Sequence, residues 1–426
     1  MKKYQLTLLG GTGVTGRNTF RHLAATLAPG TPWAIAGRNS ARLQALSSEL
    51  ENPESTPDLV IADLNDPATL EAMIRDTEVL LHLAGPYAES SEPIFEFCLK
   101  YKTHYADIGG ETFFIKDMIA KYHKAARARG VIFLPTAGYE SVPFDLLTKM
   151  TIEHVRTKFD EGCREAKIVA AFHQLSEKRD RRISGGSIGT IKNILHGDHV
   201  GAFNDMACLL PPSPYSRRTG KRNRVLYKAR FDEDVQNYVG PLQPAPFLNV
   251  PVVLRSAHLL REQGLDYGDD FIYRDSMTME FYASSPTGQR RAARKSARLN
   301  GLLSLAMRGP KIARKLFLRR LDAMGIQPGD GPREDTLDQV DYELRMFATS
   351  DTGIRLQTSL SAKGHPGYLS TSKIIAEVGI YLSELKAPKP HLCGVVTPAS
   401  VLGNDFLPRL ERAQVTFSIG GQRSDS

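Results

Sequence analysis

The stretch Leu6-Thr7-Leu8-Leu9-Gly10-Gly11-Thr12-Gly13-Val14-Thr15-Gly16 predicts a phosphate-binding turn between a strand and a helix. Its leucines suit a buried parallel strand. Beyond the glycines, the helical spacing i, i+3, i+4, i+7 is followed by the apolar residues Phe20, Leu23, Ala24 and Leu27. A dinucleotide pyrophosphate is bound at such a strand-to-helix turn. The glycine spacing is a shifted form of the common Gly-x-Gly-x-x-Gly fingerprint, and an isolated loop of this kind could equally be an ordinary turn.

The first part of the chain alternates between short apolar runs and helical patterns. Helix starts are marked by Asp66-Pro67 and Glu92-Pro93. Strands are expected over residues 4–9, 33–36, 59–62, 79–84, 104–108 and 131–134. This alternation predicts an α/β fold with a Rossmann-type, doubly wound parallel sheet. We therefore expect a dinucleotide-binding domain over residues 1–150, with the ligand beyond the carboxyl ends of the strands.

The residue after the second predicted strand selects the cofactor. A domain that prefers NAD has Asp or Glu there, where it binds the ribose 2′-hydroxyl. This chain has Arg38-Asn39 instead, which predicts NADP(H) with Arg38 on the 2′-phosphate. The alternative is a surface arginine at a helix start.

Residues after the third and fourth predicted strands would contact the rest of the cofactor. Asp63 with Leu64 would meet the adenine edge or form a turn, and Ala84-Gly85-Pro86 would pass the nicotinamide ribose or form a tight turn. The expected cofactor-binding residues are Gly10, Thr12, Gly13, Val14, Thr15, Gly16, Arg38, Asn39, Asp63, Leu64, Ala84, Gly85 and Pro86.

Candidate reactive groups follow the later strands. Tyr87 offers a hydroxyl near the expected nicotinamide position. Asp107 and Glu111 place two carboxylates beside a glycine pair, where either could be an acid, a base or a substrate anchor, or could cap the following helix. The segment 138–145 is interpreted as a crossing between domains, with Tyr139 and Ser141 as candidate proton donors.

Beyond about residue 151 the strand–helix rhythm stops. Strands are expected over 166–175 and 277–282, an antiparallel hairpin over 340–346 and 354–360, and a long loop over 201–230. We expect a mixed α+β substrate or dimerisation domain over 151–366. A C-terminal helix and strand over 367–426 should complete the core.

Composition limits the class of protein. The 426-residue chain has 41% hydrophobic and 24% charged residues, which is typical of globular proteins. No apolar run approaches the roughly 20 residues that a membrane-spanning helix needs. The four cysteines lie far apart without metal-ligand spacing, so we expect reduced thiols, no metal site and a cytoplasmic location.

The net charge of +8 is concentrated in one segment. Residues 289–321 carry eleven Lys and Arg residues and no acidic residue. Because the remainder is slightly acidic, a local partner is expected instead of nucleic acid. Basic amphipathic helices bind anionic membrane surfaces or acidic partners, including phosphopantetheine carrier proteins. The alternative is a solvated helical hairpin.

The chain resembles the saccharopine dehydrogenase-like oxidoreductases, particularly the branch that contains trans-acting enoyl reductases. The likeness covers almost the full length. It rests on residues 10–16, Ala36-Gly37-Arg38, Ala84-Gly85-Pro86-Tyr87, Tyr105-Ala106-Asp107, Gly110-Glu111, Tyr122-His123, 138–145, Ser184-Gly185-Gly186, Gly367-Tyr368 and 394–399. Tyr139-Glu140 departs from the usual Phe-Asp of that family.

The resemblance implies an NADPH-dependent reduction of a C=C bond in a polyketide, fatty-acyl or lipid-linked substrate, free or bound to a carrier protein. Tyr87 and Tyr139 would then be the hydrogen-bond donor and the acid, with Glu111 as an orienting carboxylate. Two alternatives are a saccharopine-type amino-acid dehydrogenase and a non-catalytic NADP-binding or lipid-surface scaffold. A homodimer and peripheral membrane contact through residues 289–321 are further expectations.

Overall fold

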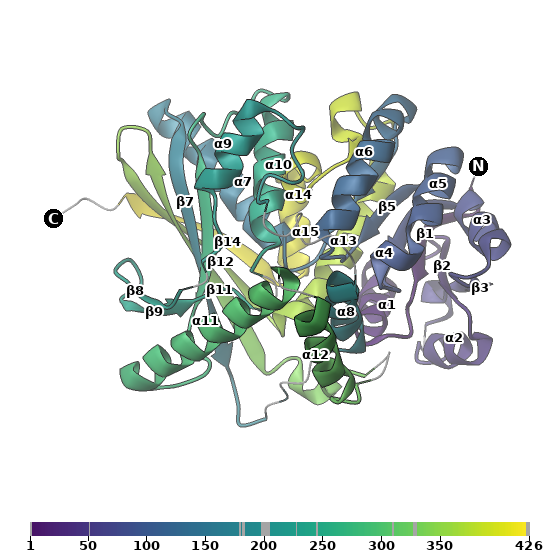
Figure 1. Ribbon diagram of the computed structural model, residues 1–426. Helices are drawn as coiled ribbons and strands as arrows, with labels where there is room; N and C mark the ends of the chain where they lie inside the picture. The colour runs from purple at the N-terminus through teal and green to yellow at the C-terminus, as the bar shows by residue number, and fades with distance from the viewer. Residues whose placement is uncertain are drawn as a thin grey trace.

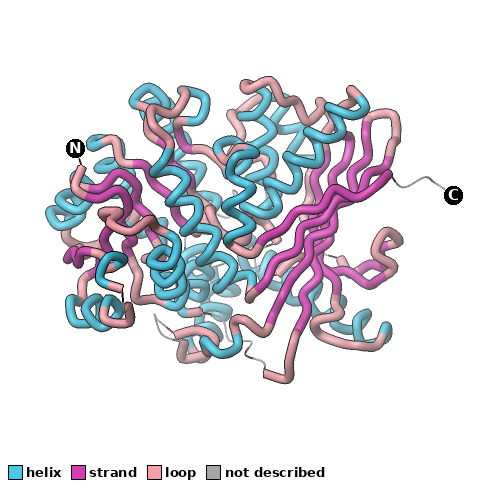
Figure 2. Tube along the Cα trace, turned by 180° about the vertical axis from the view of Figure 1, so that it is seen from behind, coloured by secondary structure: helices cyan, strands magenta, loops and turns pink. Residues whose placement is uncertain are grey.

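Two seven-stranded sheets form the two halves of the molecule (Figure 1). The computed structural model describes residues 2–50, 52–178, 180, 184–196, 205–226, 228–243, 246–308, 311–326 and 330–422. Seen from behind, helices fill the space between the sheets (Figure 2). The Rossmann-type sheet and the second mixed sheet predicted from the sequence are both confirmed. The division of the chain at residues 150 and 366 stays a prediction.

The first sheet is parallel throughout and has the order β13-β6-β5-β4-β1-β2-β3. Its strands are β1 (Tyr4–Leu9), β2 (Trp33–Gly37), β3 (Asp58–Ile61), β4 (Thr77–His82), β5 (His104–Asp107), β6 (Ile132–Leu134) and β13 (Gly394–Val395). Leu6 and Leu8 are fully buried, as expected for a strand covered on both faces. The short strand β13 brings the C-terminal part of the chain into this sheet.

The helices of the first half connect these strands. They are α1 (Val14–Thr26), α2 (Ser40–Ser47), α3 (Pro67–Arg75), α4 (Tyr87–Ser90), α5 (Glu92–Tyr101) and α6 (Thr112–Arg129). The predicted helix start at Asp66-Pro67 is confirmed, because the Asp66 side chain accepts a hydrogen bond from the Ala68 N–H.

Helix α13 (Thr371–Glu384) covers the first sheet from the C-terminal side of the sequence. It follows a π-helical turn over Pro366–Ser370 and packs on β1 and β4. Gly379 permits this close approach, since a Cβ there would lie 2.8 Å from Leu81 Cδ1 and 2.9 Å from Leu6 Cδ1.

The second sheet has the order β14-β12-β11-β7-β10-β9-β8. Its strands are β7 (Cys163–Gln174), β8 (Arg230–Asp232), β9 (Asn237–Gly240), β10 (Ile272–Thr278), β11 (Val340–Ser350), β12 (Arg355–Lys363) and β14 (Val415–Gln422). The predicted hairpin is β11–β12. The strand predicted over 277–282 is wrong in its bounds: β10 ends at Thr278, and a turn closed by the Ala283 N–H to Met279 carbonyl bond follows it.

Helices of the second half lie on this sheet or beside the sheets. They are α7 (Val142–Phe159), α8 (Gly185–His196), α9 (Pro214–Arg222), α10 (Asn249–Arg261), α11 (Pro286–Arg308), α12 (Lys311–Asp322), α14 (Pro398–Val401) and α15 (Leu407–Arg412). The loop predicted over 201–230 contains α9, which Ser213 caps through the Ser216 N–H. Residues 201–204 and 227 of that loop lie outside the described residues.

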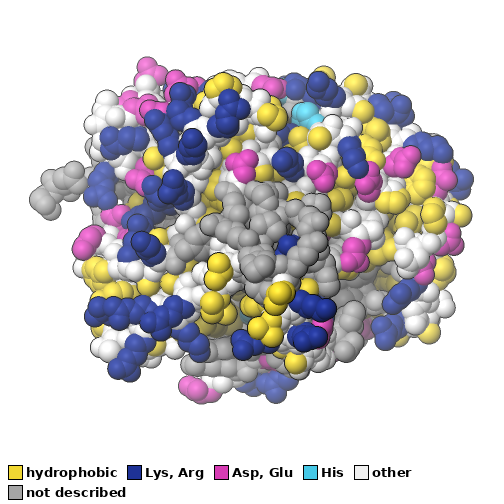
Figure 3. All heavy atoms as spheres, viewed as in Figure 1, with side chains coloured by type: hydrophobic (Ala, Val, Ile, Leu, Met, Phe, Trp, Pro, Cys, Tyr) yellow, Lys and Arg dark blue, Asp and Glu magenta, His cyan; other side chains and the backbone are white. Residues whose placement is uncertain are grey.

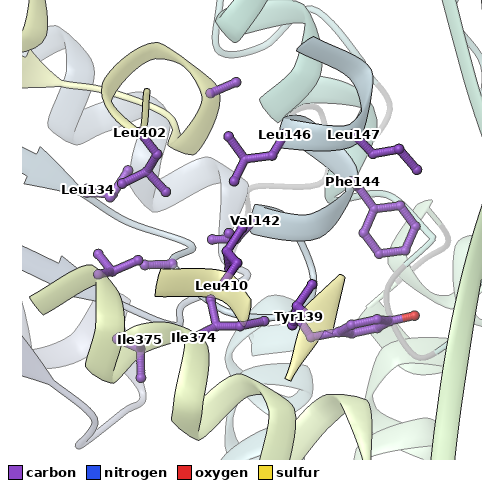
Figure 4. Packing of buried hydrophobic residues seen from close by; sticks show 14 of the residues in the cluster. Leu134, Tyr139, Val142, Phe144, Leu146, Leu147, Ile374, Ile375, Leu402 and Leu410 are labelled. Carbon is purple, nitrogen blue, oxygen red and sulfur yellow. The ribbon is translucent and has the colours of Figure 1, made fainter. Parts of the chain in front are cut away.

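One apolar core joins the halves. Side chains of α7, α13 and α15 meet in it (Figure 4), including Phe144, Ile374 and Leu410. Because this core is shared, it packs the two halves against each other. The candidate site lies between the two sheets.

Candidate functional site

The glycine loop packs as tightly as a phosphate-binding turn requires. Gly10 has φ +90°, and a Cβ there would lie 2.8 Å from the backbone of Leu83 and Ala84. A Cβ on Gly16 would lie 2.1 Å from the Gly10 carbonyl oxygen. At Gly13, in contrast, a Cβ would meet only that carbonyl oxygen at 3.8 Å. The loop is thus closed toward the sheet and open at Gly13.

The open side of the loop is the start of α1. Gly13 is the N-cap of this helix and has no side-chain capping bond. The first N–H groups of a helix lack intrahelical acceptors, and the helix dipole is positive at this end. Val14, Thr15 and Gly16 can therefore donate to a pyrophosphate. The residues present fit the cofactor that the sequence predicts.

The predicted adenosine-side residues lie beyond β2 and β3. Arg38 is exposed, and it has no ion-pair partner within the described part of the chain. Asn39 caps α2 by accepting from the Arg42 N–H at 3.0 Å. Asp63 accepts from the Asn65 N–H at 2.9 Å, and so it closes a turn. Of these residues, Arg38 has the free charge that a 2′-phosphate would engage.

A cavity of about 650 Å³ lies between the glycine loop and the second sheet. Its first wall includes Gly13, Ala84, Gly85 and Pro86. The opposite wall includes Phe172 of β7 and Val340 of β11, and α8 and the turn before α13 also contribute. The volume is in the range of small-molecule sites. The other predicted cofactor residues, Gly10, Thr12, Arg38, Asn39, Asp63 and Leu64, do not line the cavity.

Tyr87 begins α4 at the cavity wall. Its ring packs edge-on against His82 with 5.2 Å between ring centroids, and burial raises the pKa of its hydroxyl well above the usual range. The Glu111 carboxylate accepts hydrogen bonds from the Tyr87 N–H at 3.3 Å and the Ala88 N–H at 2.6 Å. Glu111 therefore holds the start of α4, and burial raises its pKa.

Glu111 does not itself line the cavity, but it also bonds to α8, which does. The Thr190 hydroxyl of α8 donates to its Oε1 at 3.3 Å. Asp107, the other carboxylate of this region, accepts from the Tyr105 hydroxyl at 2.6 Å and from the Gly109 N–H at 2.7 Å. Burial raises the pKa of Asp107 to about 6. Asp107 shapes the loop after β5 and does not line the cavity.

Tyr139 follows β6 and lines the cavity. Its N–H donates to Thr371 Oγ1 at 3.1 Å, and its ring packs edge-on against Tyr342 of β11 at 4.8 Å between centroids. Its hydroxyl is buried and has no hydrogen-bond partner within the described residues. Burial raises the pKa of this hydroxyl well above the usual range, so it stays protonated at neutral pH.

Other lining residues were not expected from the sequence. Glu140, His365 and Tyr368 all face the cavity. The His365 ring packs against Tyr368 at 4.9 Å between centroids, and the Tyr368 hydroxyl accepts from the Ser184 N–H at 2.8 Å. His365 lies in the turn after β12, more than two hundred residues from the glycine loop, and no local pattern marks it. Ser141 was a candidate donor, but it does not line the cavity.

No helix among the described residues is long and apolar enough to cross a membrane. The four cysteines are buried and free.

Comparisons with known proteins agree with this geometry. Residues 6–134 match the saccharopine dehydrogenase NADP binding domain. The chain is 29% identical to proteins named trans-acting enoyl reductase from Mycobacterium tuberculosis and Mycobacterium leprae, with 98% of this chain and 97% of each relative covered.

The fold has a solved counterpart. The structure of apo saccharopine dehydrogenase (L-Glu forming) from Saccharomyces cerevisiae superposes with a TM-score of 0.53 at 12% identity, covering 97% of this chain and 99% of that chain. The resemblance found in the sequence is confirmed, and so is the prediction of NADP(H) as the cofactor. Residues 6–134 match a saccharopine dehydrogenase NADP-binding domain over their whole length, and the chain is an NADP-dependent oxidoreductase.

Proposed function

We propose that this protein reduces the C=C bond of an α,β-unsaturated acyl substrate in the cavity between the two sheets. The observation that carries the proposal is that Tyr139 lines the cavity and that its buried hydroxyl has no hydrogen-bond partner among the described residues. A buried hydroxyl left unpaired costs about 1–3 kcal/mol. A substrate carbonyl oxygen would accept its hydrogen bond and remove that cost.

Enoyl reduction needs a hydride at the β-carbon, a donor to the developing enolate oxygen, and a proton for the α-carbon. Bound NADPH supplies the hydride. Tyr139 meets the requirement for a donor, because its position is fixed by Thr371 and Tyr342 and its hydroxyl is protonated. Tyr87 also bears a hydroxyl and lines the same cavity, and we assign to it the proton for the α-carbon.

Glu111 acts in this proposal as a positioning residue. Its carboxylate fixes the backbone at Tyr87 and Ala88 and links α4 to Thr190 of α8. Both helices line the cavity through Tyr87 and Thr190. The carboxylate therefore orients the Tyr87 side of the site without contacting the substrate.

The cofactor would lie along the glycine loop. Gly13, Val14, Thr15 and Gly16 offer the backbone for the pyrophosphate, and Arg38 the charge for the 2′-phosphate. Ala84, Gly85 and Pro86 form the wall that leads from this loop to Tyr87.

The cavity favours an acyl substrate over a dicarboxylic amino acid. Phe172, Phe281, Leu248 and Val340 make much of its wall apolar. Among the described lining residues Lys178 is the one cation, whereas a saccharopine-type substrate needs several arginines for its carboxylates. The names of the mycobacterial relatives support the same choice. A thioester of coenzyme A or of a carrier protein would present such a substrate.

The test compares two buried tyrosines in rapid-mixing measurements of NADPH oxidation with 2-enoyl thioesters. Tyr139→Phe should lower the turnover number at least about a hundredfold, the size expected for the loss of one hydrogen-bond donor to the developing oxyanion. Tyr267→Phe is the matched control, because that hydroxyl is also buried and unpaired but lies outside the cavity lining. Equal rates for the two variants, or no oxidation at saturating wild-type protein, would contradict the proposal.

A further inference from the structure

The basic segment forms a helical hairpin with an unusual surface. Helix α11 runs through Pro286–Arg308 and α12 through Lys311–Asp322. Residues 289–321 contain eleven basic residues and no acidic one. Residues 309 and 310, between the two helices in the sequence, lie outside the described residues.

Large apolar side chains are exposed in the last part of α11 and in the first part of α12. Leu299, Leu302 and Leu305 at the end of α11 are 55%, 59% and 63% exposed, and Ile312 and Leu316 at the start of α12 are 80% and 59% exposed. We call these five residues the apolar tip. Such a group of exposed large apolar residues indicates a binding surface.

Cations flank the apolar tip on both sides. Arg291, Arg294, Lys295 and Arg298 precede it on the exposed face of α11, and Arg319 and Arg320 follow it on α12. Figure 3 shows a band of Lys and Arg side chains over α11, hydrophobic side chains at its end, and further Lys and Arg side chains beyond them.

The hairpin is packed on its other face, so a lack of packing does not explain why the apolar tip is exposed. Ala293 and Asn300 of α11 are buried, and Leu318 and Leu321 of α12 share an apolar cluster with Ile188 and Leu195 of α8. The hairpin is therefore seated on the body of the protein by its other face.

The seat of the hairpin is next to the cavity. Helix α8 contributes Gly189 and Thr190 to the cavity wall and packs on α12. On the α11 side, Gln243 lines the cavity and its amide donates to Ser296 Oγ at 3.2 Å.

We propose that the hairpin docks the protein on an anionic lipid bilayer, with the apolar tip in the acyl layer and the flanking cations at the lipid phosphates. Charge complementarity carries the choice of occupant: basic helices with one exposed apolar patch bind anionic bilayers in this layered manner. A solvated hairpin would not leave five large apolar residues together in water. An acidic carrier protein would also pair with the cations, but its binding does not require an apolar patch with cations on both sides of it.

Docking would place the cavity near the membrane surface. Together with the proposed function, on which this point rests, it identifies the substrate class as acyl chains that partition into lipid. Bilayer binding itself requires neither NADPH nor turnover.

The test is flotation of the full chain with vesicles of phosphatidylcholine alone or mixed with phosphatidylglycerol. We expect binding only to the anionic vesicles, weakened by salt. Arg294→Glu/Arg298→Glu should lower the partition at least about tenfold, since each surface cation adds about 1 kcal/mol. Lys124→Glu/Lys158→Glu is the control, because these exposed lysines lie on other helices.

The apolar tip has its own pair of variants. Leu302→Ser/Leu305→Ser should also lower the partition at least about tenfold, whereas Ile61→Ser, at an exposed apolar residue of β3, should not. All these variants should oxidise NADPH with a short, water-soluble enoyl thioester at the wild-type rate, which separates docking from the proposed function. Equal binding to neutral and anionic vesicles would overturn the proposal, and so would hairpin variants that bind vesicles like wild type. It would also be overturned if the hairpin variants lost binding to an acidic carrier protein but kept binding to vesicles.

Discussion

Two glycines of the phosphate-binding turn have opposite surroundings, so alanine at each should act differently. Gly16→Ala places a methyl group 2.1 Å from the Gly10 carbonyl oxygen and should destabilise the fold by more than about 2 kcal/mol. Gly13→Ala meets nothing closer than 3.8 Å and should keep the melting temperature. It should weaken NADPH binding at least about tenfold, since the methyl group blocks the approach of the pyrophosphate. Thermal melting and NADPH fluorescence titration measure both, and equal melting temperatures for the two variants would contradict this account.

Arg38 tests the choice between the two nicotinamide cofactors. Arg38→Ala should raise the NADPH dissociation constant by about tenfold or more, because a hydrogen bond to a charged group contributes about 1.5–3 kcal/mol. The NADH dissociation constant should stay unchanged. Arg75→Ala is the control, because Arg75 is exposed at the end of α3, which leads into the opposite end of the parallel strands. If Arg38→Ala binds NADPH like wild type, the 2′-phosphate lies elsewhere.

Buried Asp275 makes stability depend on pH. Burial raises its pKa to about 7, whereas an unfolded aspartate titrates near about 4. Between these values the folded protein holds a proton that the unfolded chain has released, so the free energy of unfolding falls as pH rises. Asp275→Asn keeps an acceptor for the Asn249 amide and removes this loss.

The measurement is urea unfolding of wild type and Asp275→Asn at several pH values from about 5 to about 7. The stability of Asp275→Asn relative to wild type should increase with pH. Exposed Asp117→Asn is the control and should run parallel to wild type. Parallel curves for all three proteins would show that Asp275 does not titrate in this range.

Sequence reasoning reached residues whose roles are local. Tyr139 follows a predicted strand, as expected. Glu111 does not cap the helix that follows it, because its side chain makes no capping bond at the start of α6; its carboxylate accepts from the Tyr87 and Ala88 N–H groups at the start of α4 instead. The position of His365 in the cavity wall could not be predicted from the sequence, because it depends on how a turn far away in the sequence packs in the folded protein. The lack of a hydrogen-bond partner for the Tyr139 hydroxyl could not be predicted either, since it depends on Tyr342 and the packing of the second sheet.

At the scale of elements, α13 is a helix from the C-terminal part of the sequence that covers one face of the first sheet. Gly379→Ala would push a methyl group to 2.8 Å from Leu81 and should destabilise the protein by about 1–3 kcal/mol. Gly301→Ala in α11 is the matched control, because nothing lies within 4 Å of the added Cβ. Helix propensity should make that variant more stable by about 0.5–1 kcal/mol. Chemical unfolding measures both, and shifts of the same sign would contradict the packing described for α13.

Elements with strong local signals were predictable, and elements made by tertiary contacts were not. The strands near the glycine loop and the hairpin β11–β12 follow from apolar runs and alternation. Strand β13 is only two residues long and forms because β6 offers a free edge. Helix α9 lies in a Pro-rich basic stretch, and its Ser213 cap is a weak signal among many serines.

For the whole molecule, the two sheets and their shared core explain why the cavity draws residues from so much of the chain. Tyr87 and Tyr139 come from loops of the first sheet, Phe172 and Val340 from the second, and His365 from the turn before α13. The cofactor-binding residues could be predicted from the glycine motif of the first sheet. The residues expected to contact the substrate could not, because they come from both sheets and meet only when the two sheets pack face to face.

The most direct test of the central claim is a single turnover with NADPH deuterated at C4 and a 2-enoyl thioester, read by mass spectrometry and NMR of the product. The account predicts a saturated thioester that carries deuterium at the β-carbon, formed by wild type and Tyr267→Phe and strongly reduced in Tyr139→Phe. It would be contradicted if saturating protein left the thioester unreduced, or if the deuterium appeared instead in saccharopine formed from lysine-derived semialdehyde and glutamate.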